Sequence, residues 1–188
     1  GNKVLYVSNI TDIDDKLIKK GQADGTTMQE VARKFEAEYI KDSEGLNVKT
    51  PTVRPRATEH IGEIIKIVKD LVESGHAYVA HNGDVYFRVK SDPGYGKLSH
   101  LNLDDLESGN RELRSQMDDD LKEDPADFAV WKAAKPGEPS WNSPWGQGRP
   151  GWHIECSAMS RKHLGKTIDL HAGGQDLIFP HHENEIAQ

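Results

Sequence analysis

The residues best suited to binding a metal are the only cysteine of the chain, Cys156, and the pair His181 and Glu185. A His and a Glu four residues apart project from the same face of a helix. A thiolate, an imidazole and a carboxylate are the mixture of soft and borderline ligands that suits Zn²⁺. Three protein ligands indicate either an open catalytic position or a fourth ligand elsewhere. An ordinary helical pair beside an unrelated cysteine is the alternative.

A second group of candidate residues follows an apolar, strand-like segment at 168–170. Gly173 and Gly174 form a turn there, and Asp176 comes directly after it. Ligands of doubly wound sheets bind at the carboxyl ends of the strands, so this turn is placed to meet a nucleotide. Glycines would let backbone amides approach the nucleotide, and the carboxylate can accept hydrogen bonds from ribose hydroxyls. A plain left-handed turn with Asp176 as a helix N-cap explains the same residues, and both interpretations stay open.

Further candidates each have an ordinary explanation. Trp152, four residues before Cys156, is typical of a core aromatic side chain. Thr11 could N-cap a helix, and the aspartates within residues 12–15 favour helix capping over a Mg²⁺ site. His171 is either a partner that orients a metal ligand or a histidine at the end of a strand.

The elements that must position these residues alternate between helix and strand. Residues 4–7 predict a buried parallel strand. Thr27 and Glu30 form a capping box that begins a helix ending near Gly45. A second helix has an apolar stripe over residues 61–72 and ends at Gly75, and a third covers residues 154–164.

The middle of the chain has a different pattern. Asn82-Gly83 between residues 77–81 and 84–89 predicts an antiparallel hairpin. Residues 128–131 predict another strand, and the Gly-, Pro- and Trp-rich residues 136–150 predict a long loop. Acidic residues outnumber basic ones over residues 104–127, which is typical of a solvated, mobile insertion.

Size and composition limit the class of protein. With 188 residues, 35% of them hydrophobic and 29% charged, the chain is expected to be a soluble domain, with room for a small insertion. No apolar run approaches the roughly 20 residues that cross a bilayer, so we expect no membrane partner. A single cysteine excludes an internal disulfide and favours the cytoplasm. The net charge of -7 argues against broad nonspecific binding of nucleic acid.

Four ordered segments, residues 6–16, 55–58, 148–159 and 176–185, resemble cysteinyl-tRNA synthetase, a class I aminoacyl-tRNA synthetase. The family's first zinc-binding cysteine, its His-Ile-Gly-His motif and its Lys-Met-Ser-Lys-Ser loop are not in this sequence, so the chain resembles an internal piece of the catalytic domain. The resemblance implies an α/β fold, a partial Rossmann-like nucleotide-binding fold with an inserted, mostly β connective domain. The implied division is residues 1–76, 77–150 and 151–188, the middle part being the insertion.

One short segment of the chain resembles the missing His-Ile-Gly-His motif of the ATP site. His60-Ile61-Gly62-Glu63 has Glu where the motif ends in His. It also lies inside the predicted second helix, whereas a phosphate site needs the free amides of a helix N-terminus. We therefore interpret His60 as a surface or capping residue.

The resemblance implies part of a cysteine-tRNA ligase, which activates L-cysteine with ATP to cysteinyl-adenylate and transfers it to tRNA(Cys). One Zn²⁺ per subunit would select the substrate thiol, with its fourth protein ligand outside this chain, and ATP would bind with Mg²⁺. The implied site residues are Thr11 and Trp152 for cysteine, Gly173, Gly174 and Asp176 for ATP, and Cys156, His181 and Glu185 for zinc. No catalytic residue is assigned here, and we expect a monomeric chain that is inactive alone.

Two other functions compete with this one. The ligase of mycothiol synthesis also activates cysteine but passes it to an amino sugar; residues 183–186 and the long insertion favour the synthetase. A noncatalytic, zinc-stabilised binding module is the rival from another class. Flanking sequence that contains the two ATP motifs would indicate an enzyme, and flanking sequence that lacks them would indicate the binding module.

Overall fold

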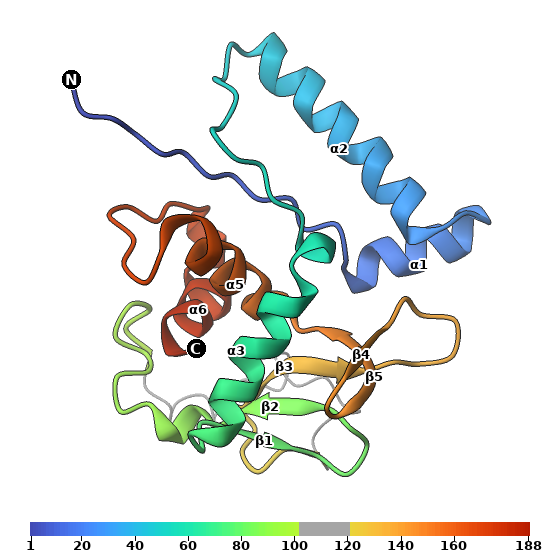
Figure 1. The fold of residues 1–188 in the computed structure, drawn as a ribbon, viewed down its shortest axis with the longest axis vertical. Helices are drawn as coiled ribbons and strands as arrows, with labels where there is room; N and C mark the ends of the chain where they lie inside the picture. The colour runs from blue at the N-terminus through green and yellow to red at the C-terminus, as the bar shows by residue number, and fades with distance from the viewer. Residues whose placement is uncertain (102–120) are drawn as a thin grey trace. The chain divides into compact units, whose positions relative to one another are not determined.

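The computed structural model describes residues 1–101 and 121–188, and Figure 1 shows their helices and strands. The chain divides into two compact units. One comprises Gly1–Glu63 with Ala158–Ile168, and the other comprises Ile64–Ser157 with Asp169–Gln188. Both units draw on segments distant in sequence. The predicted three-part division into residues 1–76, 77–150 and 151–188 stays a prediction.

The first unit is mainly helical. Helix α1 covers Asp15–Asp24 and helix α2 covers Met28–Gly45. The Asp14 side chain accepts the Lys16 N–H at 2.6 Å and so caps α1, as expected for the aspartates of residues 12–15. The capping box formed by Thr27 and Glu30 begins α2 and is confirmed. A 3-10 turn at Ala57–Glu59 then leads to α3, which covers Ile61–Glu73.

Two predicted strands, at residues 4–7 and 168–170, are not formed as such. Residues 4–7 take part in a single isolated parallel bridge, Val7 to Val53, and a second bridge joins Ile10 to Arg56 just beyond them; Val4 is 75% exposed. Residues 168–170 form no strand, and Leu170 is 83% exposed. A parallel strand is stable when neighbours and helices cover it. Among the described residues neither segment has such cover, so their apolar character alone does not produce a buried strand.

The second unit contains a five-stranded sheet in the order β1-β2-β3-β5-β4, antiparallel at every pairing (Figure 1). The predicted hairpin is confirmed, because β1 (Ala77–Val79) pairs with β2 (Val85–Phe87) and Gly83 takes a φ of 92° in the turn. The predicted strand at residues 128–131 is confirmed within β3 (Phe128–Ala133). The chain is therefore mixed α/β with an antiparallel sheet.

The predicted loop at residues 136–150 was wrong. It contains β4 (Trp141–Ser143) and β5 (Gly146–Pro150), which pair with each other, and β5 also pairs with β3. Gly148 makes this possible, because a Cβ there would lie 2.2 Å from Trp131 Nε1. A glycine-rich segment thus serves as a strand where a large side chain crosses closely over it.

The acidic segment is only partly described, since residues 102–120 lie outside the described residues. Asp124 and Asp127, at its end, are 8% and 1% exposed, so the expectation of a solvated segment was wrong for them. Asp127 accepts hydrogen bonds from Tyr78 Oη at 2.7 Å and from the N–H groups of Val89 and Asp124 at 2.9 and 3.1 Å. The carboxylate therefore ties three segments of the second unit together.

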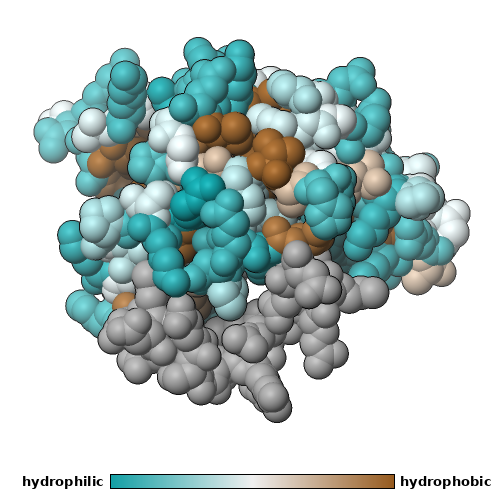
Figure 2. All heavy atoms as spheres, turned by 90° about the horizontal axis from the view of Figure 1, so that it is seen from below, coloured by the Kyte–Doolittle hydropathy of each residue, from teal (hydrophilic) through white to brown (hydrophobic). Residues whose placement is uncertain are grey.

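The surface of the described residues carries apolar side chains as well as charged ones. On the face in Figure 2, apolar groups lie in small clusters between hydrophilic side chains, which is ordinary for a protein surface. No described helix is both long enough and apolar enough to cross a membrane.

Candidate metal centre

Helix α5 (Trp152–Leu164) supplies one side of the candidate site. It begins directly after β5, where a Cβ on Gly151 would lie 2.0 Å from the carbonyl oxygen of Ala129. Glycine therefore lets the chain turn from strand to helix against β3. Trp152 and Cys156 lie four residues apart, which places them on one face of α5.

The other side comes from the segment Ile178–His182, which is kinked at Phe179 (φ -130°, ψ 134°) and continues into α6 (Glu183–Ala187). His181 Nε2 lies 2.9 Å from Glu185 Oε1, so the predicted i,i+4 relation is observed. Both side chains are nearly buried, 6% and 9% exposed. The pair thus faces the interior of the second unit rather than solvent.

Cys156 joins this pair. The sulfur of Cys156, a ring nitrogen of His181 and a carboxylate oxygen of Glu185 all lie within 4.8 Å of one another. The expectation that these three side chains converge is confirmed, whereas their role as metal ligands stays a prediction. All three belong to the second unit.

The contact between His181 and Glu185 has the distance of a hydrogen bond but not its geometry. Glu185 Oε1 is buried and has no hydrogen-bond partner of acceptable angle, although the imidazole nitrogen is 2.9 Å away. Buried carboxylate oxygens are normally satisfied. The sulfur of Cys156, a ring nitrogen of His181 and a carboxylate oxygen of Glu185 converge around a nearly buried point, which is the spacing that a shared cation requires, so the residues fit a zinc ion.

Charges around Glu185 favour its ionised form. Burial acts to raise the pKa of this carboxyl, but interactions with His181, His171 and Cys156 together hold the pKa below its ordinary value. A carboxylate ionised in this way is ready to bind a cation.

The site includes a residue that sequence reasoning did not single out. His153 Nδ1 lies 3.0 Å from His181 Nδ1, on the side of the ring opposite Nε2. Burial lowers the pKa of His153 to about 3, so this imidazole is neutral near pH 7. Its position next to Trp152 and near Cys156 was the available signal, because residues that flank a ligand on a helix often orient other ligands.

Trp152 lies beside the site. Its ring stacks on the His181 ring with centroids 4.5 Å apart and planes 28° apart. The residue is 43% exposed, so its interpretation as a core aromatic was wrong. A half-exposed indole next to the converging ligands forms a wall that a small substrate could touch.

A second group of possible ligands shares Glu185. His171 Nε2 donates to Glu185 Oε2 at 2.6 Å, and His182 also lies close by. The two carboxylate oxygens therefore face different histidines. Of the two interpretations of His171, orientation of a metal ligand agrees with this contact.

The glycine turn is exposed. Gly173 passes close to the His182 ring, where a Cβ would lie 2.4 Å from Nε2, and the Asp176 carboxylate folds back over Gly174. The short 3-10 turn Gln175–Leu177 has no side-chain cap, so Asp176 is not an N-cap. The ATP-binding roles of all three residues stay predictions.

The structure of the first unit tests two other interpretations drawn from the sequence, those of Thr11 and His60. Asp14, not Thr11, caps α1, and the role of Thr11 in cysteine binding stays a prediction. His60 immediately precedes α3 and is only 7% exposed, so it is not a surface residue. Its Nδ1 contacts the Arg56 carbonyl oxygen at 2.7 Å and its Nε2 contacts His163 Nε2 at 2.9 Å.

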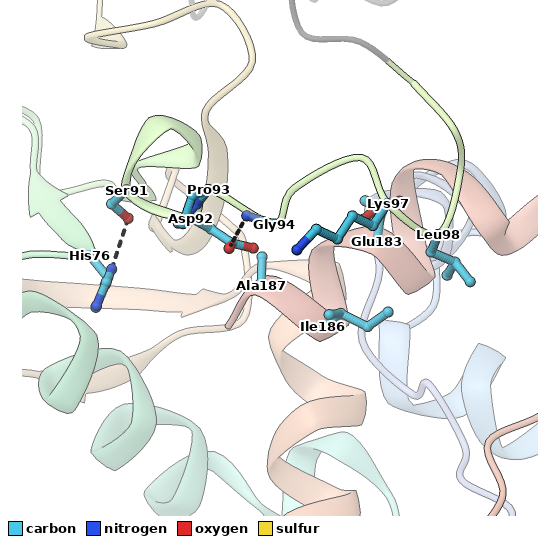
Figure 3. Close-up of a pocket in the computed structure, with 10 residues that line it drawn as sticks. All are labelled: His76, Ser91, Asp92, Pro93, Gly94, Lys97, Leu98, Glu183, Ile186 and Ala187. Atoms are coloured by element: carbon cyan, nitrogen blue, oxygen red, sulfur yellow. Dashed lines mark hydrogen bonds between the residues drawn. The ribbon is translucent and has the colours of Figure 1, made fainter.

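Glu183 and Asn184 lie between His181 and Glu185 in the sequence, and their side chains bind a neighbouring loop. Glu183 accepts the N–H groups of Gly96 at 2.9 Å and Ser99 at 2.7 Å, and Asn184 accepts the hydroxyl of Tyr95. These bonds hold the loop at residues 93–100 next to α6. A pocket of about 410 Å³ lies there, and Figure 3 shows the Lys97 side chain extending within it.

Comparison with known proteins identifies the chain. The family model of the class I (C) tRNA synthetase catalytic domain matches residues 1–188. The chain belongs to the class I cysteinyl-tRNA synthetase family. The cysteine-tRNA ligases of Caldicellulosiruptor saccharolyticus and Limosilactobacillus reuteri are 57% and 59% identical to it over 188 residues, which is 100% of this chain.

The match to cysteinyl-tRNA synthetases covers a part of those proteins. The aligned region is 39% of the first relative and 40% of the second, so the chain spans about 40% of their length. The resemblance drawn from four segments thus extends over the whole chain. Membership of the cysteinyl-tRNA synthetase family is established, and the activity of a complete enzyme is a matter for proposal.

Proposed function

We propose that this chain forms the zinc- and cysteine-binding part of a cysteine-tRNA ligase, which activates L-cysteine with ATP to cysteinyl-adenylate and transfers it to tRNA(Cys). The observation that carries the proposal is the convergence of Cys156, His181 and Glu185 in a chain 57% identical to a cysteine-tRNA ligase. A partial Rossmann-like nucleotide-binding fold is part of the proposal, and the parallel bridges near residues 7–10 support it.

Zinc selection of the substrate thiol follows from the ligand chemistry. Cysteine and serine differ by one atom, which hydrogen bonding discriminates poorly. When bound, Zn²⁺ supplies a Lewis acid that holds a thiolate far more strongly than a hydroxyl. Cys156, His181 Nε2 and Glu185 Oε1 would hold the ion and leave room for further ligands. The charge of the two anionic side chains balances the divalent cation.

The remaining contacts of the substrate come from neighbouring residues. Trp152, half-exposed beside His181, would pack against the cysteine side chain and exclude water from it. Thr11 is proposed as a second contact to the amino acid. Gly173, Gly174 and Asp176 would meet ATP, which binds with Mg²⁺, through backbone amides and a carboxylate on the exposed turn.

Metal substitution tests the proposal without requiring a complete enzyme. The chain is loaded with Co²⁺, and its absorption spectrum is titrated with L-cysteine and L-serine. We expect a thiolate-to-cobalt charge-transfer band that Cys156→Ser removes. L-cysteine should perturb the spectrum at a concentration at least about 100-fold below L-serine, the size of discrimination that differential coordination must supply.

The same titration distinguishes the proposed function from its rival, a noncatalytic zinc-binding module. A noncatalytic zinc module would bind Co²⁺ through Cys156 but respond equally to both amino acids, and that result would contradict the proposal. Metal binding unaffected by Cys156→Ser would contradict it as well. Sedimentation of the metal-loaded chain tests the expectation of a monomer.

A further inference from the structure

The candidate ligands His181 and Glu185 lie on a short segment that cannot hold its own position. Helix α6 has five residues, and isolated helices of that length are not stable in water. The residues before it are kinked at Phe179, whose φ and ψ angles are not helical. The placement of the two ligands must therefore come from contacts with other segments.

Two side chains between the ligands make such contacts. Glu183 and Asn184 are each only 2% exposed. Glu183 is two residues from each ligand, and residues two apart on a helix project from nearly opposite sides. Its carboxylate accepts the backbone N–H groups of Gly96 and Ser99, and Asn184 accepts the hydroxyl of Tyr95. The loop that carries these three donors therefore holds α6 on the side turned away from the ligands.

The loop is held in shape by its own hydrogen bonds. The Tyr95 N–H donates to the Asp92 carbonyl oxygen at 3.2 Å. The Lys97 N–H donates to the Gly94 carbonyl oxygen at the same distance, and the Asp92 side chain accepts the Gly94 N–H at 2.7 Å. Gly96 takes a φ of 91°, which a glycine adopts without strain. The loop therefore presents its donors to α6 in a fixed arrangement.

We propose that Tyr95 is a positioning residue of the candidate metal centre and acts through Asn184. Its hydroxyl holds the flank of α6, so that His181 and Glu185 stay turned towards Cys156. This inference rests on the proposed function, because it concerns how the chain places two zinc ligands. The loop supplies no ligand itself, and its contribution is to keep a short, kinked segment from turning or shifting.

Tyr95 allows a test that changes no charge. Burial, with the Glu183 and Asp92 carboxylates nearby, raises the pKa of Tyr95, so the hydroxyl stays protonated and donates at neutral pH. Tyr95→Phe removes that donor and keeps the ring. Tyr78→Phe is the matched control, because burial also raises the pKa of Tyr78 and its hydroxyl donates to the buried carboxylate of Asp127 at 2.7 Å. That bond does not involve α6.

The test is a double-mutant cycle in zinc affinity, measured by competition with a chromogenic chelator. Tyr95→Phe should weaken zinc binding at least about 5-fold, the lower end of the coupling between linked sites. Asn184→Leu removes the acceptor and should weaken zinc binding by a similar factor. In the Asn184→Leu background, Tyr95→Phe should cause no further loss, because residues that act through one contact are not additive. Tyr78→Phe should bind zinc within about 2-fold of the parent chain, as expected for a site with no shared partner.

Amide exchange of the metal-free chain gives a second measurement that does not depend on zinc. Tyr95→Phe should speed exchange in residues 181–187, because the loss of a contact that holds a segment favours its local opening. Tyr78→Phe should leave exchange of these amides unchanged.

Two results would overturn the inference. Equal losses of zinc affinity in Tyr95→Phe and Tyr78→Phe would mean a general loss of stability. A full loss from Tyr95→Phe in the Asn184→Leu background would mean that Tyr95 acts by another route. If the parent chain binds no zinc, the zinc part of the proposed function fails, and the exchange rates alone decide whether Tyr95 holds the segment. Should Asn184→Leu not fold, the comparison of the two tyrosine variants still decides.

Discussion

Three buried carboxylates in the second unit are satisfied in different ways. Asp127 accepts three hydrogen bonds, and Glu183 accepts two backbone N–H groups. Glu185 leaves Oε1 without any. Since an unsatisfied buried oxygen costs about 1–3 kcal/mol, it is expected where a ligand completes the bonding. For Glu185 that oxygen lies at the candidate site, where a bound cation would complete its bonding.

Asp127 should make stability fall as the pH rises. Burial raises the pKa of its carboxyl in the folded state, despite the hydrogen bonds from Tyr78 and Val89. The stabilisation associated with the protonated group is complete below the unfolded pKa of about 3.9 and is lost as pH rises through the folded-state pKa. Asp127→Asn cannot ionise, so the stability of the parent relative to this variant should decrease with pH across that window.

Urea denaturation of both proteins between acidic and neutral pH measures this difference. The constant offset between them reflects altered hydrogen bonding and is not diagnostic. A relative stability of the parent that increases with pH over the window would show that the pKa is lowered rather than raised.

At the scale of elements, α5 and the segment from Ile178 to α6 bring the candidate ligands together. α5 is anchored by the strand before it, because β5 passes under Trp131 at Gly148. α6 is anchored by the loop at residues 93–100. Neither anchor contains a predicted ligand, so the geometry of the site depends on the sheet and on this loop.

Gly148→Ala should destabilise the sheet. A Cβ would lie 2.2 Å from Trp131 Nε1 and 2.5 Å from the Lys132 carbonyl oxygen, and such overpacking costs roughly 1–3 kcal/mol. Gly62→Ala is the matched control, because nothing lies within 4 Å of a Cβ there in α3; it should stabilise by up to about 1 kcal/mol. Equal unfolding midpoints for the two variants would show that β5 does not need its close approach.

Glu183→Gln should loosen the loop at residues 93–100 from α6. One carboxylate oxygen becomes an amide group that cannot accept the Gly96 or Ser99 N–H, and an unmade buried bond costs about 1–3 kcal/mol. Urea unfolding and protease cleavage within the loop report the change. Glu59→Gln, which weakens an exposed ion pair with Arg56, should cost less than about 1 kcal/mol. A Glu183→Gln variant as stable as the Glu59→Gln control would contradict the anchoring role.

At the scale of the whole molecule, the candidate ligands all belong to one of the two compact units. Zinc should therefore stabilise that unit first. At a free concentration of 100 times the dissociation constant, bound zinc contributes about 2.7 kcal/mol. We expect slower amide exchange by mass spectrometry in residues 152–157 and 178–187, with a smaller change in α2.

Cys156→Ser serves as the control and should show no zinc-dependent protection in either unit. Equal protection of α2 and of residues 178–187 in the parent would mean that the two units open together. That outcome would show that zinc stabilises the chain through a single cooperative unfolding transition and not through local stabilisation of the second unit.

Interactions between residues close in sequence were predictable from the sequence alone. The capping box at Thr27, the hairpin at Asn82-Gly83 and the i,i+4 relation of His181 and Glu185 all depend on local backbone geometry. The four segments resembling the synthetase family also pointed to Cys156 as the third member of the site. These predictions needed no knowledge of how distant segments pack.

Only the tertiary structure decided the rest. It placed His153 against His181, left Glu185 Oε1 without a hydrogen bond, and made strands of the glycine-rich residues 136–150. It also left residues 4–7 with one isolated bridge, at Val7, where a buried strand was expected. These outcomes depend on which segments meet across long separations in sequence, and hydrophobic periodicity and turn residues report only on near neighbours.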